Sequence, residues 1–479
     1  MEYEPVIGLE VHCQLLTDSK IFCGCRTRFG DPPNTNVCPI CLGMPGVLPV
    51  LNRRAVEFAL RAGLALECDI QPLSVFARKN YFYPDLPKGY QISMFDQPLM
   101  LGGHLDIVAE GQRKRVGITR IHMEEDAGKL LHEGFPDSAS RSYVDFNRSG
   151  VPLIEIVSEP DMRSPEEAHA YFSTLRNILV WIGITDGNME EGSLRCDANV
   201  SLRPRGREAF GTRAELKNLN SFKFVQSALR HEIERQSELL ESGGKVVQET
   251  RLYDPKQDRT VSMRSKEEAH DYRYFPEPDL PPLAVEAPFI EAARQGLPEL
   301  PAARRARFVR EHGLKEADAQ TLTGERALAD YFEAVAAASG NARAAANWVL
   351  TEVLRKVRES RADVLAVPLP PERLAGLIRL VDGGTISGKI AKELFEEIYT
   401  TGADPAEMVR VRGLTQVTDE GPIRAAVDAV LKAHADKVAA YRAGKTGLLG
   451  FFVGQVMKDL GGTASPSIVN RLLLERLGS

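Results

Sequence analysis

Residues 189–221 carry the pattern that most constrains the fold of this chain. From Leu194 to Leu202 apolar residues alternate with polar ones, and a shorter alternation runs from Arg213 to Lys217. A period of two is typical of strands with one buried and one polar face. The intervening residues are rich in glycine and charge and include one proline. The segment therefore predicts a hairpin with a long loop.

The polar face of this hairpin carries an unusual mixture of side chains. Its members are Arg195, Asp197, Asn199, Glu215 and Lys217. Carboxylates, a carboxamide, a guanidinium and an ammonium group are the set needed to hold Mg²⁺ and phosphate. An ordinary solvated hairpin explains the same residues, so the pattern alone leaves both interpretations open.

Two further strands offer candidate ligands. A strand is predicted from Val6 to Leu15, where Glu10 and His12 share one face and lie about 7 Å apart. They suit a cation, although a solvent-facing polar strand is the alternative. Glu155 interrupts the apolar run VPLIEIVSEPD, and burying a lone carboxylate is costly unless it is paired or bound to a metal. Glu155 is therefore the most informative of these residues.

Three consecutive carboxylates, residues 124–126, follow the strand-like segment VGITRI. They cannot all point in one direction, so at most one or two of them enter a site. No glycine-rich phosphate loop or nucleophile motif accompanies the candidate residues. The residues by themselves thus indicate metal-dependent phosphoryl or nucleotidyl chemistry and go no further.

Four of the seven cysteines lie close together in the sequence, as Cys23-Gly-Cys25 and Cys38-Pro-Ile-Cys41. Two close pairs joined by a loop predict a four-thiolate zinc site, with unbound buried thiols as the alternative. We expect Cys13, Cys68 and Cys196 to be small core residues.

The length of 479 residues predicts more than one domain. The N-terminal part combines strand patterns with capped helices, as at Ser164-Pro165, and predicts an α+β or mixed α/β domain. Beyond about Gly296 helical periodicity replaces alternation. There is no run of about 18 apolar residues and no signal-peptide pattern, so we expect a cytoplasmic protein that does not span a membrane.

The segment from Arg78 to Ser93 mixes lysine, arginine and tyrosine with prolines, which predicts a rigid loop. Such side chains stack on nucleotides or RNA ends, but a packed surface loop has the same composition. The formal net charge of -6 argues against a chain coated in basic charge. It leaves room for a local basic surface.

The chain resembles, along its whole length, the B subunit of the bacterial tRNA-dependent amidotransferases. Besides the two cysteine pairs, the matching segments are VIGLEVHCQL, IHMEEDAGK, VPLIEIVSEPD, MEEGSLRCDANVSLR, AELKNLNSF, RYFPEPDLPP, SGKIAKELFEEI and GLLGFFVGQVMK. The resemblance implies a three-subunit enzyme that makes Gln-tRNA(Gln) from Glu-tRNA(Gln) and Asn-tRNA(Asn) from Asp-tRNA(Asn).

In such an enzyme the B subunit uses ATP and Mg²⁺ to phosphorylate the side-chain carboxylate on the tRNA. Ammonia from the glutaminase A subunit then displaces the phosphate, and a small C subunit holds A and B together. The family architecture implies an α+β fold with three parts. These are a cradle-like catalytic domain over residues 1–295 with a mixed sheet, a helical domain over 296–410, and a tRNA-binding helical tail over 411–479.

The resemblance also implies roles for individual residues. It assigns Mg²⁺ to His12, Glu125 and Glu155, and further catalytic carboxylates to Glu10 and Glu215. It places nucleotide or substrate contacts at Arg195, Asp197, Asn199 and Lys217. The cysteines match a zinc site found in only some members, so zinc would be structural at Cys23, Cys25, Cys38 and Cys41.

Two other functions stay open at this level. A non-catalytic, zinc-stabilised tRNA-binding subunit explains the cysteines but leaves Glu155 without a purpose. A free-standing metal-dependent hydrolase explains the carboxylates and needs no partner subunit. The sequence also leaves open whether Gln-tRNA, Asn-tRNA or both are made.

Overall fold

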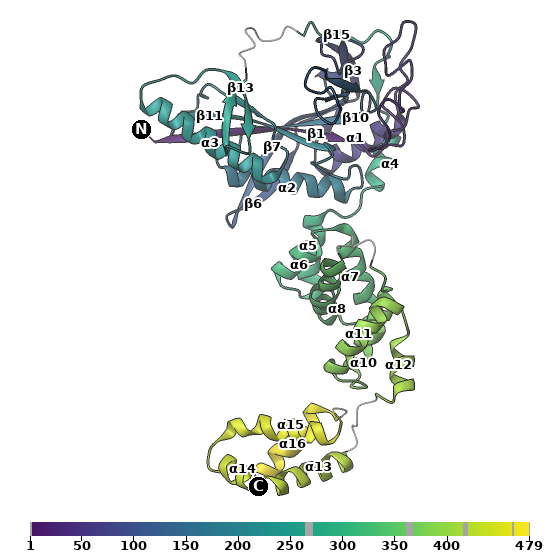
Figure 1. Cartoon of the computed structure of the whole chain (residues 1–479), viewed down its shortest axis with the longest axis vertical. Helices are drawn as coiled ribbons and strands as arrows, with labels where there is room; N and C mark the ends of the chain where they lie inside the picture. Colours follow the sequence, from purple (N-terminus) through teal and green to yellow (C-terminus); the bar gives the residue numbers. More distant parts are fainter. Residues whose placement is uncertain (1, 264–271, 361–366, 415–419, 462–463, 479) are drawn as a thin grey trace. The chain divides into compact units, whose positions relative to one another are not determined.

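The computed structural model describes residues 2–263, 272–360, 367–414, 420–461 and 464–478. The chain forms two compact units, Met1–Leu300 and Pro301–Ser479. The first unit combines a large mixed sheet with helices, and the second is helical (Figure 1). This arrangement confirms the predicted α+β class with a helical region after the sheet. The division of the helical region into two domains stays a prediction.

The strands of the first unit are β1 (Tyr3–Gln14), β2 (Asp69–Ile70), β3 (Leu73–Asn80), β4 (Tyr90–Gln97), β5 (Met100–Leu101), β6 (His104–Ala109), β7 (Gln112–Glu125), β8 (Lys129–Leu131), β9 (Tyr143–Asp145), β10 (Pro152–Ser158), β11 (Leu194–Pro204), β12 (Ala214–Lys217), β13 (Glu249–Asp254), β14 (Arg259–Ser262), β15 (Phe275–Pro276) and β16 (Leu283–Ala284). The main sheet has the order β14-β13-β12-β11-β1-β10-β7-β4-β3-β15, and β8 and β9 form a separate two-stranded sheet.

The centre of the sheet is antiparallel, with β1 between β10 and β11. Strands β11 and β12 pair antiparallel, so the predicted hairpin is confirmed. Strands β12 and β13 pair parallel, which makes the sheet mixed. Because alternate residues of a strand point to opposite faces, the strands at the centre place their apolar residues on one face and their polar residues on the other. The apolar face holds Ile7, Leu9, Val11, Cys196, Ala198 and Val200.

Three helices accompany this sheet: α1 (Arg53–Ala65), α2 (Pro165–Trp181) and α3 (Phe222–Glu241) (Figure 1). Helix α2 begins as expected, because the Ser164 hydroxyl accepts the backbone N–H of Glu167 and proline follows at the first helical position. The apolar sides of α1, α2 and α3 join the strands in one core. The helices therefore cover the apolar side of the strands.

The short helix α4 (Ala287–Gln295) completes the first unit. The helical unit contains α5 (Pro301–His312), α6 (Glu316–Leu322), α7 (Arg326–Ser339), α8 (Ala342–Trp348), the π-helical turn η1 (Val349–Val353), α9 (Leu354–Ser360), α10 (Pro371–Asp382), α11 (Gly388–Thr401), α12 (Pro405–Arg412), α13 (Glu420–Ala433), α14 (Ala435–Arg442), the 3₁₀ turn η3 (Thr446–Leu448), α15 (Leu449–Asp459) and α16 (Pro466–Leu477).

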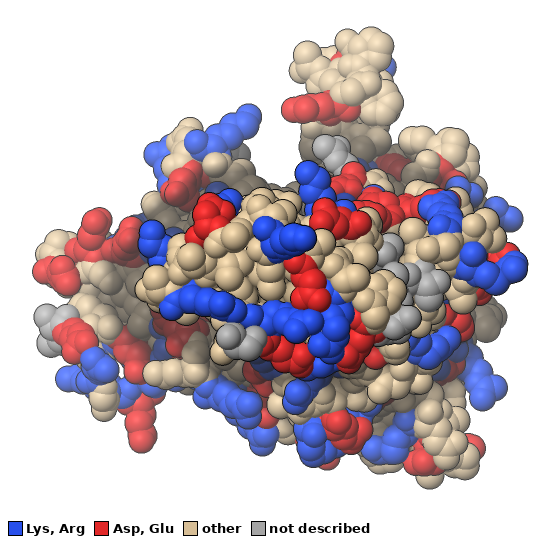
Figure 2. All heavy atoms as spheres, turned by 90° about the horizontal axis from the view of Figure 1, so that it is seen from below, with Lys and Arg blue, Asp and Glu red and all other residues tan. Residues whose placement is uncertain are grey.

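The last helices of this unit share a core of their own, with Ile423, Phe452 and Leu473 among its fully buried members. Among the described residues, no helix combines the length and the apolar character that a bilayer crossing requires. Basic and acidic side chains are interspersed on the face shown in Figure 2. Charge on that face is therefore locally mixed.

Candidate functional site

The candidate site is built from the polar face of five neighbouring strands. In register, His12 lies opposite Glu155 of β10 and Arg195 of β11, while Glu155 lies opposite His122 of β7. Glu10 pairs with Asp197 in the same way. Because paired residues of adjacent strands point to the same face, residues far apart in the sequence come together here.

Two carboxylates and two imidazoles form a buried cluster at the centre of this face. His12 Nε2 lies 3.6 Å from Glu155 Oε2 and 3.8 Å from Glu124 Oε1. His122 Nε2 lies 3.3 Å from Glu155 Oε2 and 3.8 Å from Glu124 Oε2. Two ligands of one Mg²⁺ are at most about 4.2 Å apart, since each lies about 2.1 Å from the ion. These separations therefore suit a divalent cation.

The electrostatics of the cluster favour bound positive charge. Burial by itself would lower the pKa of His122, but Glu124 and Glu155 outweigh burial and raise the pKa to about 9. Burial would raise the pKa of Glu155, yet the two imidazoles hold that pKa well below its ordinary value. Burial and the charge of Glu155 raise the pKa of Glu10. The carboxylates of Glu124 and Glu155 therefore favour positive charge on the groups that face them.

Glu125 lies elsewhere, which corrects its expected place beside His12 and Glu155. Its carboxylate accepts the backbone N–H of Ile92 at 2.9 Å and forms an ion pair with Lys88. Adjacent residues of a strand point to opposite faces, so only one of Glu124 and Glu125 can enter the cluster. The structure selects Glu124, whose donor atom joins those of His12 and Glu155.

A bulge in β7 determines which of these two glutamates faces the cluster. Val157 of β10 pairs with Arg120, while the next residue, Ser158, pairs with Ile118, so Thr119 is an extra residue on β7. One extra residue inverts which side chains face the core. Val116 and Ile118 are buried before the bulge, and Ile121 and Met123 after it. Glu124 consequently faces the polar side.

The hairpin of β11 and β12 contributes a second set of charged groups. Lys217 Nζ lies 2.7 Å from Asp197 Oδ2 and 2.8 Å from Glu215 Oε1. Thr250 of β13 donates to Glu215 at 2.7 Å, and Asn199 donates to Glu10 at 2.9 Å. Although burial opposes it, the two carboxylates raise the pKa of Lys217. Lys217 is therefore a fixed cation among acidic groups.

Arg195 is held by a network beside the cluster. Its Nη2 lies 3.0 Å from Asp126 Oδ1, and Gln14 donates to Asp126 Oδ2 at 2.6 Å. Arg148 Nε lies 3.7 Å from the same carboxylate. Burial would raise the pKa of Asp126, but Arg195 and Arg148 outweigh burial and lower it. Asp126 thus fixes the direction in which the Arg195 guanidinium points.

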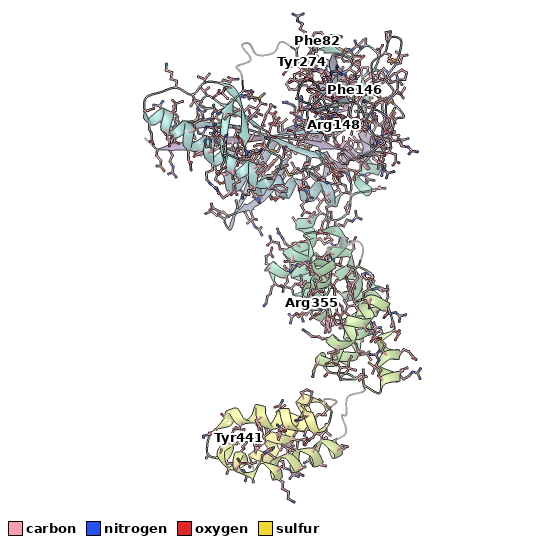
Figure 3. The ribbon with its side chains drawn as sticks, in the orientation of Figure 1. Phe82, Phe146, Arg148, Tyr274, Arg355 and Tyr441 are labelled. Atoms are coloured by element: carbon pink, nitrogen blue, oxygen red, sulfur yellow. The ribbon has the colours of Figure 1, made fainter. Side chains whose placement is uncertain are left out.

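A ladder of aromatic side chains ends at the cluster. Ring centroids lie 6.0 Å apart for Tyr81 and Tyr272, 6.0 Å for Tyr272 and Tyr274, 5.3 Å for Tyr274 and Phe95, and 6.2 Å for Phe95 and His122. Two cations flank it: Lys79 Nζ is 5.0 Å from the Tyr272 ring centre and the Arg120 guanidinium 4.4 Å from that of Phe95. Tyr274 is labelled in Figure 3.

The four cysteines of the two sequence pairs come together, with one donor atom each, as a candidate metal site. Tetrahedral zinc with bonds of about 2.3 Å separates its sulfurs by about 3.8 Å. Cys38 Sγ and Cys41 Sγ lie 3.9 Å apart, which fits this geometry. A hydrogen bond from Cys23 lowers the pKa of Cys41 below its ordinary value.

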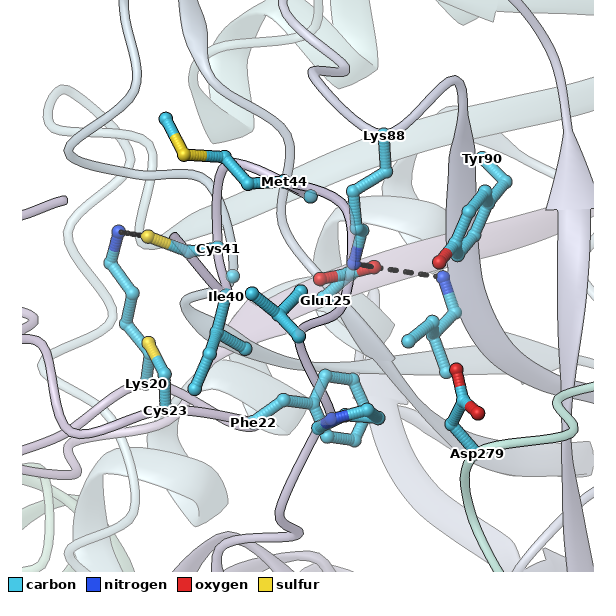
Figure 4. A pocket seen from close by; sticks show the side chains of 15 residues that line it. Lys20, Phe22, Cys23, Ile40, Cys41, Met44, Lys88, Tyr90, Glu125 and Asp279 are labelled. Atoms are coloured by element: carbon cyan, nitrogen blue, oxygen red, sulfur yellow. Dashed lines mark hydrogen bonds and ion pairs between the residues drawn. The ribbon is translucent and has the colours of Figure 1, made fainter. Parts of the chain in front are cut away.

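Figure 4 shows the cavity that runs beside these cysteines, with Lys20 next to Cys41 and Lys88 next to Glu125. The other three cysteines, Cys13, Cys68 and Cys196, are buried in the core, which confirms the expectation for them.

Comparison with known proteins gives the same assignment for nearly the whole chain. Residues 5–291 match the family described as the GatB/GatE catalytic domain, and residues 330–477 match the GatB domain. The chain belongs to the GatB family. Proteins named as the B subunit of aspartyl/glutamyl-tRNA(Asn/Gln) amidotransferase are similar to it. The one from Solidesulfovibrio magneticus is 59% identical over 476 residues, covering 99% of each chain. The one from Geotalea uraniireducens is 59% identical over 477 residues, covering 100% of each.

Within this GatB-family site, sequence reasoning missed three neighbours of the predicted residues. They are His122, Asp126 as the partner of Arg195, and Thr250 as the partner of Glu215. A signal existed for His122, which stands two residues before Glu124 and therefore on the same strand face. Thr250 carried no such signal, because its parallel pairing with β12 is a tertiary contact.

Proposed function

We propose that this chain is the subunit of a tRNA-dependent amidotransferase that activates the amino acid on misacylated tRNA. The observation that carries the proposal is the cluster of the half-buried His12 with the buried Glu124 and Glu155 on the polar face of the sheet. Such a site is expensive to maintain unless a cation occupies it. Its position between a cavity and an aromatic ladder suits a reaction that joins a nucleotide to an RNA-bound acid.

The chemistry follows from the poor reactivity of a carboxylate toward ammonia. A side-chain oxygen of Glu or Asp on the tRNA attacks the γ-phosphorus of ATP, and ADP leaves. Ammonia then attacks the acyl carbon, and inorganic phosphate departs with the carboxylate oxygen that formed the new bond. Bound Mg²⁺ would neutralise the phosphate charge during the transfer. His12, Glu124 and Glu155 would hold it.

The neighbouring fixed charges have distinct tasks in this proposal. We assign Arg195, oriented by Asp126, to the negative charge of the phosphate or aminoacyl group. Lys217 offsets the charge of Asp197 and Glu215 and keeps both carboxylates in place. Glu10, whose carboxylate accepts from Asn199, lies next to the site where the nucleotide would bind.

A cavity of about 600 Å³ adjoins Glu10 and Asn199. Its lining also includes Gly8, Phe210 and Arg213. Its volume is in the range typical of cofactor sites, about 300–1,000 Å³. An aromatic ring and a guanidinium group suit a base and a phosphate respectively. We propose this cavity as the ATP site.

We assign the aromatic ladder to the end of the RNA. Single-stranded nucleotides stack on aromatic rings, and flanking cations offset their phosphates. The ladder ends in the contact between Phe95 and His122, so a terminal nucleotide there would deliver its amino acid to the cluster. Phe82, labelled in Figure 3, lies next to Tyr81 in the sequence and is 91% exposed.

The proposal also names partners and a second metal. Ammonia would come from an amidase A subunit, and a small C subunit would hold the heterotrimer together in the cytoplasm. Misacylated Glu-tRNA(Gln) and Asp-tRNA(Asn) would be the substrates. Zinc at the four cysteines would be structural, because its ligands form a closed set of thiolates without an open position.

The test reconstitutes the complex with Glu155→Ala and supplies ammonia directly. We expect amidation of Glu-tRNA to fall by at least 100-fold, because one buried ligand of the cation is lost. Amidation at the wild-type rate would show that the activation site lies elsewhere. A non-catalytic tRNA-binding subunit predicts no ATP hydrolysis that depends on Glu-tRNA. A free-standing hydrolase predicts activity of the chain without partners.

A further inference from the structure

Lys20 is a charged side chain buried in the interior of the first unit. It is 1% exposed and ranks among the largest fully buried side chains of the described residues. Lysine is almost never fully buried unless its charge is paired. Yet Lys20 forms an ion pair with no carboxylate of the described residues. The negative charge that its ammonium group requires must therefore come from another source.

Two groups contact the ammonium of Lys20. Its Nζ donates to Cys41 Sγ at 3.6 Å and to the backbone carbonyl of Phe146 at 3.3 Å. Figure 4 shows the first of these contacts as a dashed line. A carbonyl oxygen is neutral, whereas a cysteine sulfur carries a full negative charge as a thiolate. Of the two contacts, the one with Cys41 can therefore balance the charge of Lys20.

Both members of this contact are held by neighbouring hydrogen bonds. The backbone N–H of Lys20 donates to the carbonyl of Cys25 at 2.9 Å, which ties Lys20 to the first cysteine pair. In the second pair, the backbone N–H of Cys38 donates to Cys41 Sγ at 3.2 Å. The Ser149 hydroxyl donates to the carbonyl of Cys41 at 3.4 Å. The contact between Lys20 and Cys41 therefore lies within the folded four-cysteine site.

A zinc ion at the four cysteines would make a counter-ion necessary. Four thiolates outweigh the charge of one Zn²⁺, so the loaded site stays negative, and its member Cys41 is only 4% exposed. We propose that Lys20 is the counter-ion of this zinc tetrathiolate and positions Cys41 as a ligand. The inference rests on the proposed zinc site.

Charge balance and hydrogen bonding predict two effects of Lys20. Groups that donate to the ligands of a metal typically account for about 10–100-fold in its affinity. Without the ammonium, the negative charge of the loaded site has no partner in the interior, so zinc binds more weakly. The hydrogen bond also withdraws electron density from Cys41 Sγ. Without this bond, electron transfer from sulfur to a bound Co²⁺ needs less energy, and the charge-transfer absorption moves to longer wavelength.

The experiment uses the full chain and compares Lys20→Met with Lys88→Met. Both lysines line the same cavity, but Lys88 is paired with Glu125 instead of a cysteine. Each variant removes one buried ammonium, so Lys88→Met controls for a general loss of stability. Chelator competition measures the zinc dissociation constant, which should rise at least about tenfold in Lys20→Met and stay within about threefold in Lys88→Met. In protein loaded with Co²⁺, the sulfur-to-metal band should move to longer wavelength in Lys20→Met alone.

A second measurement needs no variant, so a folding defect of Lys20→Met does not remove the test. In protein with ¹⁵N-labelled lysine, exchange of zinc for cadmium should shift one buried ammonium signal in the nuclear magnetic resonance spectrum, because Lys20 Nζ contacts a ligand sulfur.

The outcomes separate this inference from the proposed zinc site. An unchanged zinc dissociation constant or Co²⁺ band in Lys20→Met, equal weakening in Lys88→Met, or the absence of an ammonium signal that responds to the metal would overturn the role of Lys20 and leave the zinc site standing. Failure of the unaltered protein to bind zinc would overturn both.

Discussion

Glu124 and Glu125 are adjacent in sequence but point to opposite faces of β7, which makes them a matched pair for mutation. We expect Glu124→Gln to weaken cation binding by roughly two to three orders of magnitude and Glu125→Gln to leave it within about threefold of the unaltered protein. Both changes keep the size of the side chain and remove one negative charge. Both carboxylates are almost fully buried, since the side chain of Glu124 is 4% exposed and that of Glu125 is 3% exposed. Water therefore screens the two negative charges to a similar degree.

The structure sets the size of each effect. Glu124 lies 3.8 Å from both imidazoles of the cluster, so its loss removes a buried charge partner of the cation. Breaking such a pair costs about 3–5 kcal/mol. At about 1.4 kcal/mol per factor of ten, the dissociation constant rises by roughly two to three orders of magnitude. Glu125→Gln instead leaves Lys88 without its carboxylate and should lower the free energy of unfolding by a similar amount.

Mn²⁺ titration followed by electron paramagnetic resonance measures the first effect, and denaturant unfolding of the first unit measures the second. The two variants should separate cleanly, one losing cation affinity and the other stability. If Glu125→Gln weakens cation binding as much as Glu124→Gln does, Glu125 is also a ligand of the cation. That result would refute the conclusion that only Glu124 of β7 faces the cluster.

Three further predictions concern other parts of the chain. The purified protein should hold one zinc ion per chain, which Cys38→Ser should lose and Cys13→Ala should keep. Elemental analysis of protein purified under reducing conditions measures the zinc content, and a value far below one ion per chain would refute the zinc site. Tyr274→Leu should raise the KM for misacylated tRNA about tenfold, because one stacking contact is lost, and should leave the KM for ATP unchanged. If the KM for tRNA does not change, the aromatic ladder does not bind the RNA. In the helical unit, Arg307 and Arg304 outweigh burial and lower the pKa of Glu333 from its ordinary 4.5. Glu333→Gln should therefore cost about 1 kcal/mol of unfolding free energy at pH 7. The difference should vanish as pH falls from 4.5 through the lowered pKa of the folded carboxyl, because the wild-type carboxyl protonates there.

Much of the sheet was predictable because its strands obey a period of two. Alternation in residues 194–202 and 213–217 predicted the hairpin, and alternation in β1 placed Glu10 and His12 on one face. The cost of burying a carboxylate singled out Glu155, which the structure places at the centre of the candidate site. Ser164 and Pro165 predicted the start of α2.

What could not be predicted depends on irregularities and on tertiary pairing. Continuing the alternation of Val116 and Ile118 along β7 places Glu124 toward the core and Glu125 toward the site. The bulge at Thr119 inverts that phase, and a single extra residue leaves no clear mark in the sequence. The partners of Arg195 and Lys217 likewise come from the folded arrangement: Arg195 is paired with Asp126, and Lys217 with Asp197 and Glu215.

We propose that the side-chain carboxylate on the tRNA becomes an acyl phosphate before it becomes an amide. The direct measurement follows ¹⁸O from that carboxylate. Glu-tRNA(Gln) labelled in its side-chain carboxylate is amidated by the reconstituted complex with ATP and free ammonia, and the inorganic phosphate is analysed by mass spectrometry. We expect one ¹⁸O atom in each phosphate formed together with Gln-tRNA(Gln). Unlabelled phosphate alongside full amidation would contradict it.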